Sequence, residues 1–159
     1  MIKRQIMEYI PYIRSKVGHA PVILAGAAVL LLNGEGELLL LLRTDNGRWG
    51  IPGGAMEMGE QLQETAIRET QEETGLQVSN LELLDVFSGP DLYYRYPNGD
   101  EVYNVTVVYV ARDVKGEAAV DYAEHACMQF FPLNGLPENI SPPVKTILEA
   151  FRTAELRRK

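Results

Sequence analysis

The chain has 159 residues, of which 46% are hydrophobic and 23% are charged. This balance predicts one soluble globular domain over residues 1–159 and excludes a disordered chain or two domains with separate cores. Acidic residues outnumber basic ones 22 to 15, and the resulting net charge of -7 disfavours nucleic acid as a partner.

The cysteine content favours a reducing compartment, and the lengths of the apolar runs argue against a membrane segment. The single cysteine, Cys127, cannot form an internal disulfide, and no Cys/His spacing typical of structural zinc is present. The N-terminal residues lack the apolar core of a secretory signal, and no apolar run reaches the roughly 18 residues of a spanning helix. We therefore expect a cytoplasmic protein with no membrane segment.

The first predicted element is an N-terminal helical segment over residues 1–18, which Pro11 should kink or restart. Residues 21–32 and 37–43 are rich in Val, Ile and Leu and predict two buried strands. The Asn-Gly-Glu-Gly turn between them predicts that they pair as a hairpin. The glycine-rich residues 45–59 predict a loop with one short strand inside it.

A polar helix is predicted next, over residues 60–74, and it should end at Gly75. A closing helix over residues 141–157 should begin with Ser141 as its N-cap. Further strands are predicted at residues 76–88, 101–114 and 128–132. A turn at residues 97–100 should separate the first two of these strands. These elements predict an α/β fold in which one mixed sheet is flanked by helices.

Three carboxylates of the polar helix lie on one arc of its surface. With 3.6 residues per turn, Glu72 lies about 60° to one side of Glu69 and Glu73 about 40° to the other. Their mutual repulsion and their place at the negative end of the helix dipole each cost roughly 0.2 to 1 kcal/mol. Stability alone does not explain this arrangement.

An apolar stripe borders the three carboxylates and contains only Leu62, Ala66 and Ile67, with Thr70 beside them. Side chains at such a border line a cleft, where hard divalent cations such as Mg²⁺ or Mn²⁺ stabilise a carboxylate cluster. Arg68 can orient one of the carboxylates through a bidentate contact. The alternative is a solvated acidic helix face with loose partners.

The neighbouring residues favour the metal interpretation. Gly54, Glu60 and the run Arg68-Glu69-Thr70-Gln71-Glu72-Glu73-Thr74-Gly75-Leu76 match the Nudix box, Gly-x5-Glu-x7-Arg-Glu-U-x-Glu-Glu-x-Gly-U, where U is a bulky aliphatic residue. The one departure is Thr70 at the first U position. The similarity outside the box is carried by residues 43, 49–54, 130–133 and 136–137. The chain thus resembles the Nudix hydrolase family, which implies an α/β/α sandwich with a mixed central sheet.

The resemblance implies Mg²⁺-dependent hydrolysis of a diphosphate bond, with Mn²⁺ as a substitute ion. Carried onto this chain, Glu69, Glu72 and Glu73 are the implied metal ligands. The carbonyl of Gly54 resembles a further ligand, and its alternative role is a tight turn alone. Glu60 resembles a supporting ligand or orienting group, and its alternative role is helix capping. Bound metal would offset the repulsion between an acidic site and a pyrophosphate.

The general base is left open between two places in the chain. Related proteins use either a glutamate of the box, here Glu69 or Glu73, or a glutamate of a late loop, for which Glu124 is the candidate. His125 beside it is a second candidate, with a surface histidine as the alternative. Arg68 completes the catalytic set by orienting a carboxylate.

Three residues are candidates for substrate binding. Arg43 at the end of the second strand would bind phosphate, with a plain surface arginine as the alternative. Tyr93 and Tyr94 would stack on a base or ribose, or would be aromatics of the sheet surface without function. Trp49 is interpreted mainly as a packing residue beneath the glycine turn.

We therefore predict Mg²⁺-dependent hydrolysis of a nucleoside diphosphate derivative, such as a nucleotide sugar or ADP-ribose, to a nucleoside monophosphate and a phosphorylated remainder. The alternatives are a nucleoside triphosphate pyrophosphohydrolase and a Nudix-like module that senses a nucleotide without cleaving it. An enzyme acting on RNA 5′ ends is disfavoured by the acidic balance. The predicted partner is a small nucleotide, and exposed sheet edges are compatible with a homodimer.

Overall fold

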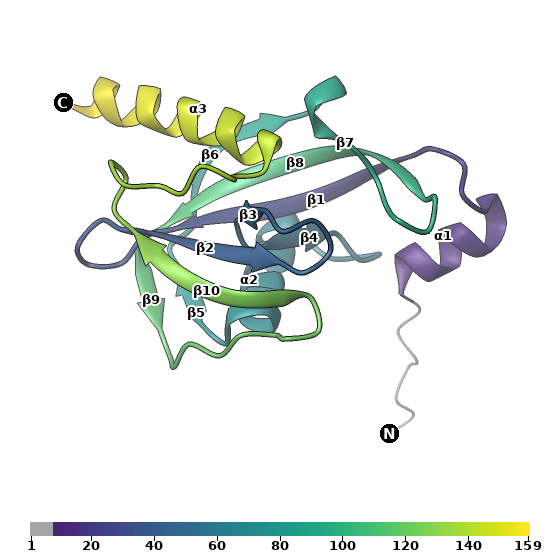
Figure 1. Cartoon of the computed structure of the whole chain (residues 1–159), viewed down its shortest axis with the longest axis horizontal. Coiled ribbons are helices and arrows are strands. Elements are labelled where there is room, and N and C mark those ends of the chain that lie inside the picture. Colours follow the sequence, from purple (N-terminus) through teal and green to yellow (C-terminus); the bar gives the residue numbers. More distant parts are fainter. Residues whose placement is uncertain (1–7) are drawn as a thin grey trace.

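The computed structural model describes residues 8–159, so the first seven residues of the predicted N-terminal helix lie outside the described part of the chain. Five strands form a mixed central sheet (Figure 1): β1 (Val22–Leu31), β4 (Gly53–Ala55), β6 (Glu82–Phe87), β7 (Tyr93–Arg95) and β8 (Glu101–Ala111). The order is β4-β1-β8-β6, and β7 also pairs with β8. β1 and β8 run parallel and the other pairs are antiparallel, which confirms the predicted mixed sheet.

A second sheet packs beside the first and is wholly antiparallel, in the order β10 (His125–Phe131), β2 (Leu38–Arg43), β3 (Trp49–Gly50). The predicted hairpin between the first two strands is therefore wrong, because β1 and β2 share only the isolated bridge between Leu32 and Leu38. Both strands are apolar on both faces, so their side-chain pattern does not specify a partner.

Two predicted strands are each divided into shorter ones. The strand expected at 76–88 becomes β5 (Gln77–Ser79) and β6, which are separated at Asn80, a residue with φ of 54°. The strand expected at 101–114 becomes β8 and β9 (Asp113–Lys115), and β9 pairs with β5 in a small third sheet. A left-handed residue ends strand geometry, and asparagine tolerates that conformation better than most residues.

Residues 8–159 also form three α-helices: α1 (Tyr9–Val17), α2 (Leu62–Thr74) and α3 (Pro142–Arg158). A short 3₁₀ turn, η1 (Pro90–Leu92), precedes β7. Pro11 lies in the first turn of α1, where the missing N–H costs no helical hydrogen bond, so it does not interrupt the helix. Ser141 occupies the N-cap position of α3, but its side chain makes no capping hydrogen bond.

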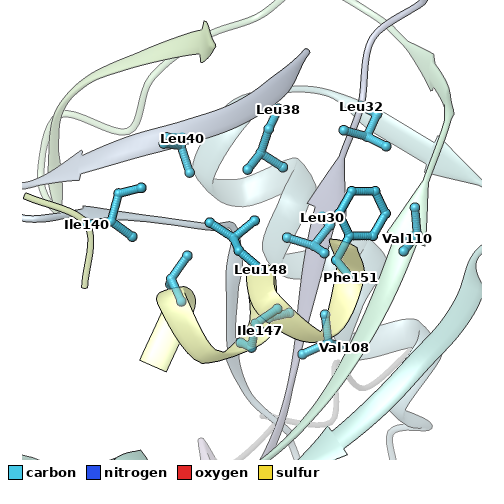
Figure 2. Close-up of a cluster of buried hydrophobic side chains, with 12 residues drawn as sticks. Leu30, Leu32, Leu38, Leu40, Val108, Val110, Ile140, Ile147, Leu148 and Phe151 are labelled. Atoms are coloured by element: carbon cyan, nitrogen blue, oxygen red, sulfur yellow. The ribbon is translucent and has the colours of Figure 1, made fainter. Parts of the chain in front are cut away.

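The helices α2 and α3 cover opposite faces of the central sheet, which confirms the α/β/α arrangement. Figure 2 shows one of two apolar clusters, in which Leu148 and Phe151 of α3 meet Leu30 of β1 and Leu38 and Leu40 of β2. Alternate residues of the same strands enter the second cluster, where they meet Ala66 of α2. Both faces of β1 and β2 are thus buried, as their composition predicts.

The buried face of α2 differs from the predicted apolar stripe. It consists of residues Thr65, Ala66, Thr70, Glu73 and Thr74, whereas Ile67 is 42% exposed. The helix can bury its threonines because their hydroxyl groups donate to its own backbone, from Thr70 Oγ1 to Ala66 O at 2.8 Å and from Thr74 Oγ1 to Thr70 O at 2.6 Å. The buried face is therefore turned toward Glu73 relative to the predicted stripe, and Glu73 lies at the border of the helix that faces the protein interior.

The polar helix ends as expected at Gly75, which is left-handed with φ of 71°. The predicted turn at 97–100 joins β7 to β8, with a hydrogen bond from Tyr96 N to Asp100 O at 2.8 Å. Among residues 8–159, no helix combines the length and the apolar character needed to span a membrane.

Candidate active site

A cleft of about 830 Å³ opens on the face of the central sheet toward α3. Its walls are the inner border of α2, the glycine strand β4, the loop of residues 43–48, β7 and the start of α3. Glu69, Glu73 and Glu124 line this cleft together with Arg43, so the sheet collects side chains that are far apart in the sequence.

The glycine strand β4 lies directly against two of the carboxylates. The backbone N–H of Gly53 donates to Glu73 Oε2 at 2.9 Å. A Cβ at Gly54 would lie 2.5 Å from the carboxyl carbon of Glu69, so a larger residue would displace that side chain. The glycines therefore allow both carboxylates to approach the backbone closely.

Gly26 of β1 also contributes to this approach and was missed by the sequence analysis. A Cβ at this position would lie 2.5 Å from the carbonyl oxygen of Gly54, so only glycine lets β4 pair here with β1. The one signal in the sequence was a glycine inside an apolar strand, which indicates a close approach of another backbone.

Both carboxylates bear an ionisation penalty. Burial raises the pKa of Glu73 to about 8, although the hydrogen bond from Gly53 lowers it and the charges of Glu69 and Glu124 raise it. Burial also raises the pKa of Glu69, against the effect of Arg68. A cation beside these groups would reverse the penalty.

Arg68 and Glu60 form the polar support behind the site. Arg68 binds Glu60 with two donors, Nε to Oε1 at 2.6 Å and Nη2 to Oε2 at 3.0 Å, and its Nη1 donates to Glu69 Oε1 at 2.8 Å. Glu60 Oε2 also accepts from Glu57 N and Thr65 Oγ1, and Arg68 holds the pKa of Glu60 at about 2. Glu60 therefore orients Arg68.

The alternative role of Glu60 as a helix cap is wrong. The N-cap of α2 is Gln61, which forms a capping box with Glu64. Glu60 instead accepts hydrogen bonds from the turn before the helix and from the first turn of the helix itself.

The late loop meets α2 at the cleft. One candidate ligand atom from each of Glu73, Glu124 and His125 lies within 4.8 Å of the other two. The carbonyl oxygen of Glu124 accepts hydrogen bonds from Thr44 N at 3.0 Å and Thr44 Oγ1 at 2.9 Å, which tie the loop to the end of β2. His125 is 5% exposed, so the alternative of a surface histidine is wrong.

Glu72 is the outlying member of the three glutamates. Its side chain is 57% exposed and contacts Arg68 Nη1 at 3.3 Å. The arc predicted from the helical wheel thus spreads from buried Glu73 through half-buried Glu69 to the exposed Glu72.

Arg43 is fixed by a partner that the sequence analysis did not identify. Its Nε and Nη2 donate to the two carboxylate oxygens of Asp45 at 2.9 and 2.8 Å, and this pair raises the pKa of Arg43 and lowers that of Asp45. Tyr94 donates its hydroxyl to Asp45 Oδ2 at 3.1 Å, and its ring lies 5.9 Å from the Arg43 guanidinium. Arg43 is therefore held in one orientation at the cleft.

The candidate aromatics fall into two groups. Tyr93 and Tyr94 line the cleft, where Tyr93 donates its hydroxyl to Glu101 Oε1 at 2.6 Å and its ring lies 5.0 Å from that of Tyr103. Trp49 packs edge to face on Phe131, with ring centroids 5.0 Å apart, which confirms its interpretation as a packing residue.

The donor set at the cleft and directly beside it fits a divalent cation. It contains two carboxylates whose ionisation is opposed by burial, a third carboxylate on the late loop, and an imidazole whose buried Nδ1 has no hydrogen-bond partner among the described residues. Clustered carboxylate oxygens are the usual protein ligands of Mg²⁺ and Mn²⁺.

A protein-family model described as a NUDIX domain matches residues 23–151. ADP-ribose pyrophosphatase of Methanocaldococcus jannaschii is 34% identical over 154 residues, which cover 94% of this chain and 81% of that protein. RNA pyrophosphohydrolase of Roseobacter denitrificans is 30% identical over 143 residues, and the aligned region covers 77% of this chain and 88% of that protein. The crystal structure of a MutT NUDIX hydrolase from Burkholderia pseudomallei matches 81% of this chain and 98% of its own, with a TM-score of 0.70 and 28% identity.

Proposed function

Because this chain belongs to the Nudix hydrolase family, we propose that it cleaves the diphosphate linkage of a nucleoside diphosphate derivative. The products are a nucleoside monophosphate and a phosphorylated remainder, and the proposed substrates are nucleotide sugars, ADP-ribose and similar small molecules. One observation carries this proposal: Glu69 and Glu73 lie against a glycine strand, in a cleft whose volume suits a ligand of that size.

The proposed cofactor is Mg²⁺, for which Mn²⁺ can substitute. Glu69, Glu72, Glu73 and the carbonyl of Gly54 would hold it, and Glu60 would support this set through Arg68. When bound, the cation supplies positive charge to the phosphate oxygens and lowers the pKa of the attacking water.

The chain's own residues divide the remaining work. Arg43, held by Asp45, presents a fixed cation to a phosphate oxygen at the cleft. Tyr93 and Tyr94 offer ring faces to a base or ribose from β7. Glu124 lies at the surface of the cleft beside Glu73 and is the proposed general base, which takes the proton of the attacking water on a carboxylate oxygen.

The relatives support two different substrates. The relative named ADP-ribose pyrophosphatase supports a small dinucleotide-like substrate, whereas the one named RNA pyrophosphohydrolase supports a 5′ end of RNA. The net charge of -7 favours the small substrate, because a polyanionic strand would be repelled over a much larger surface.

A substrate panel with Mg²⁺ tests the proposal. It contains ADP-ribose, a uridine diphosphate sugar, a nucleoside triphosphate and a 5′-triphosphorylated RNA, and the products are separated by anion-exchange chromatography. We expect nucleoside monophosphate from the first two compounds, and we expect Glu69→Gln and Glu73→Gln each to lower turnover by about a hundredfold or more.

The matched control is Glu149→Gln, which removes an exposed carboxylate of α3 away from the cleft and should keep wild-type turnover. Binding of a nucleoside diphosphate derivative without release of nucleoside monophosphate would support the sensing module instead. Cleavage restricted to the triphosphate or the RNA would reject the proposed substrate class, and a fully active Glu73→Gln variant would reject the metal ligands.

A further inference from the structure

One buried side chain beside the cleft has no role in the proposed function. His125 is the first residue of β10, and its Nδ1 is buried without a hydrogen-bond partner among residues 8–159. Buried polar atoms are nearly always paired, because an unpaired one loses the hydrogen bond that water supplied in the unfolded chain. Within the described residues this nitrogen is therefore free to bind a water molecule or an ion.

Two carboxylates lie close to a ring nitrogen of the same imidazole. The candidate ligand atoms of Glu73, Glu124 and His125 lie within 4.8 Å of one another. Ligands that bind one metal ion at about 2 Å lie within roughly 4 Å of each other, so small rotations of these side chains would close the set around a single ion.

The backbone fixes each of the three residues independently. Glu73 accepts from Gly53 N, and Glu124 is tied through its carbonyl oxygen to Thr44. His125 N donates to Asp121 O at 3.0 Å, and the pairing of β10 with β2 is irregular between His125 and Cys127. Such an irregularity redirects side chains near a site and is a common device at strand ends.

The position of His125 distinguishes a ligand from a proton acceptor. Glu73 and Glu124 line the cleft, whereas His125 is not among its lining residues and is 5% exposed. Because one of its ring nitrogens lies within 4.8 Å of a carboxylate oxygen of both residues, we interpret His125 as a ligand of an ion held between them rather than as a proton acceptor at the cleft surface.

We propose that His125 is a nitrogen ligand of a divalent metal ion shared with Glu73 and with one carboxylate oxygen of Glu124, whose other oxygen remains the proposed proton acceptor. This nitrogen makes this end of the site bind Mn²⁺ more tightly than Mg²⁺. Mg²⁺ favours oxygen ligands and retains its waters, whereas first-row transition ions accept imidazole nitrogen readily. The inference deepens the proposed function, on which it rests, because it names the ion that one end of the site selects.

Pulsed electron paramagnetic resonance with Mn²⁺ alone tests the ligand directly. The full chain is prepared with ¹⁵N only in histidine, and the spectrum is compared with that of the unlabelled protein. We expect a nitrogen modulation on bound Mn²⁺ that changes with the label. The chain has only two histidines, so His19→Gln should retain the modulation and His125→Gln should lose it.

Calorimetric titration with Mn²⁺ and with Mg²⁺ tests the preference. The His125→Gln variant should bind Mn²⁺ about tenfold more weakly than the wild type, while its affinity for Mg²⁺ should change by less than about threefold. The exposed His19, whose Nδ1 pairs with Asp100 at 2.6 Å, provides the matched control, and His19→Gln should keep both affinities. Circular dichroism checks the fold of each variant.

Bound Mn²⁺ without a nitrogen modulation in the wild type would overturn the inference. An equal loss of affinity for Mn²⁺ and for Mg²⁺ in His125→Gln would also overturn it. If that variant fails to fold, the label comparison in His19→Gln, in which His125 is the remaining histidine, still decides the matter. The substrate panel separates this outcome from the proposed function: cleavage without the modulation rejects only the ligand, and modulation without cleavage rejects only the hydrolase.

Discussion

Glu73 is the residue at which ionisation and burial conflict most strongly. Its pKa rises from an ordinary 4.5 to about 8 in the fold, so the carboxylate destabilises the metal-free protein once it ionises. When the pKa of a carboxyl group is raised in the fold, its contribution to the free energy of unfolding is fully present below pH 4.5. This contribution is lost as the pH rises through 8. Glutamine has nearly the same shape and carries no charge.

We therefore expect metal-free Glu73→Gln to be more stable than the wild type at pH 8 by about 2 to 4 kcal/mol, and no more stable at pH 4.5. Urea unfolding with a chelator present, at the two pH values, measures the difference. Glu149→Gln is the control and should follow the wild type at both. A variant without a gain at pH 8 would show that burial does not oppose the ionisation of Glu73.

Glu60 has the opposite linkage, because Arg68 lowers its pKa from 4.5 to about 2. A lowered carboxyl pKa contributes stability above pH 4.5, and this contribution disappears as the pH falls through 2. Glu60→Gln should cost about 1 to 2 kcal/mol at pH 7 and clearly less near pH 3.

Urea unfolding of the wild type and of Glu60→Gln at the two pH values checks this expectation. Turnover should fall as well, because Arg68 would lose its bidentate partner and hold Glu69 less firmly. A cost independent of pH would indicate that the side-chain shape matters more than its charge.

At the scale of the element, strand β4 contains two glycines with different tasks. A Cβ at Gly53 would lie 2.6 Å from Ala27 O and 2.8 Å from Ala28 Cα, both on the backbone of β1. The three atoms nearest to a Cβ at Gly54 all belong to the carboxylate of Glu69, at the end of a flexible side chain. The first contact is with a fixed strand and the second with a group that can move.

Gly53→Ala should therefore destabilise the protein by about 2 kcal/mol or more, because two paired strands must separate. Gly54→Ala should cost less than about 1 kcal/mol but lower turnover by about tenfold or more, because Glu69 is displaced from its place. Thermal unfolding and the substrate panel measure the two effects separately. Equal effects on stability would contradict the assignment of Gly54 to the site.

The scale of the element also shows why strand pairing escaped prediction. The extents of β1 and β2 follow from their Val, Ile and Leu content, but their side chains are apolar on both faces and do not indicate a partner. The site on helix α2 was predictable because its carboxylates oppose the stability of the helix. Its buried face was not, because threonines can replace aliphatic residues when their hydroxyls bond to the helix.

At the scale of the whole molecule, the family pattern in the sequence anticipated the layers and the glutamate cluster. It did not anticipate the pairing of Arg43 with Asp45, the contact of Gly26 with β4 or the burial of His125. Each of these depends on which strands become neighbours. Residues separated by many positions in the chain meet only through that topology, so no local pattern carries the information.

The net charge of the whole molecule depends on whether metal is bound. The formal value of -7 counts every carboxylate as ionised, but Glu73, with a pKa of about 8, is mostly protonated at pH 7. The metal-free protein is therefore about one unit less negative than its formal charge. A ligand carboxylate must lose its proton before it binds an ion.

Binding of Mn²⁺ or Mg²⁺ at pH 7 should accordingly release close to one proton per ion from Glu73, and the affinity should rise with pH up to about 8. Calorimetry in two buffers with different ionisation enthalpies measures the released protons, because the apparent heat then depends on the buffer. Glu73→Gln should remove this buffer dependence, and Glu149→Gln should preserve it. A wild-type binding heat that is the same in both buffers would mean that Glu73 is already ionised in the metal-free fold or does not bind the ion.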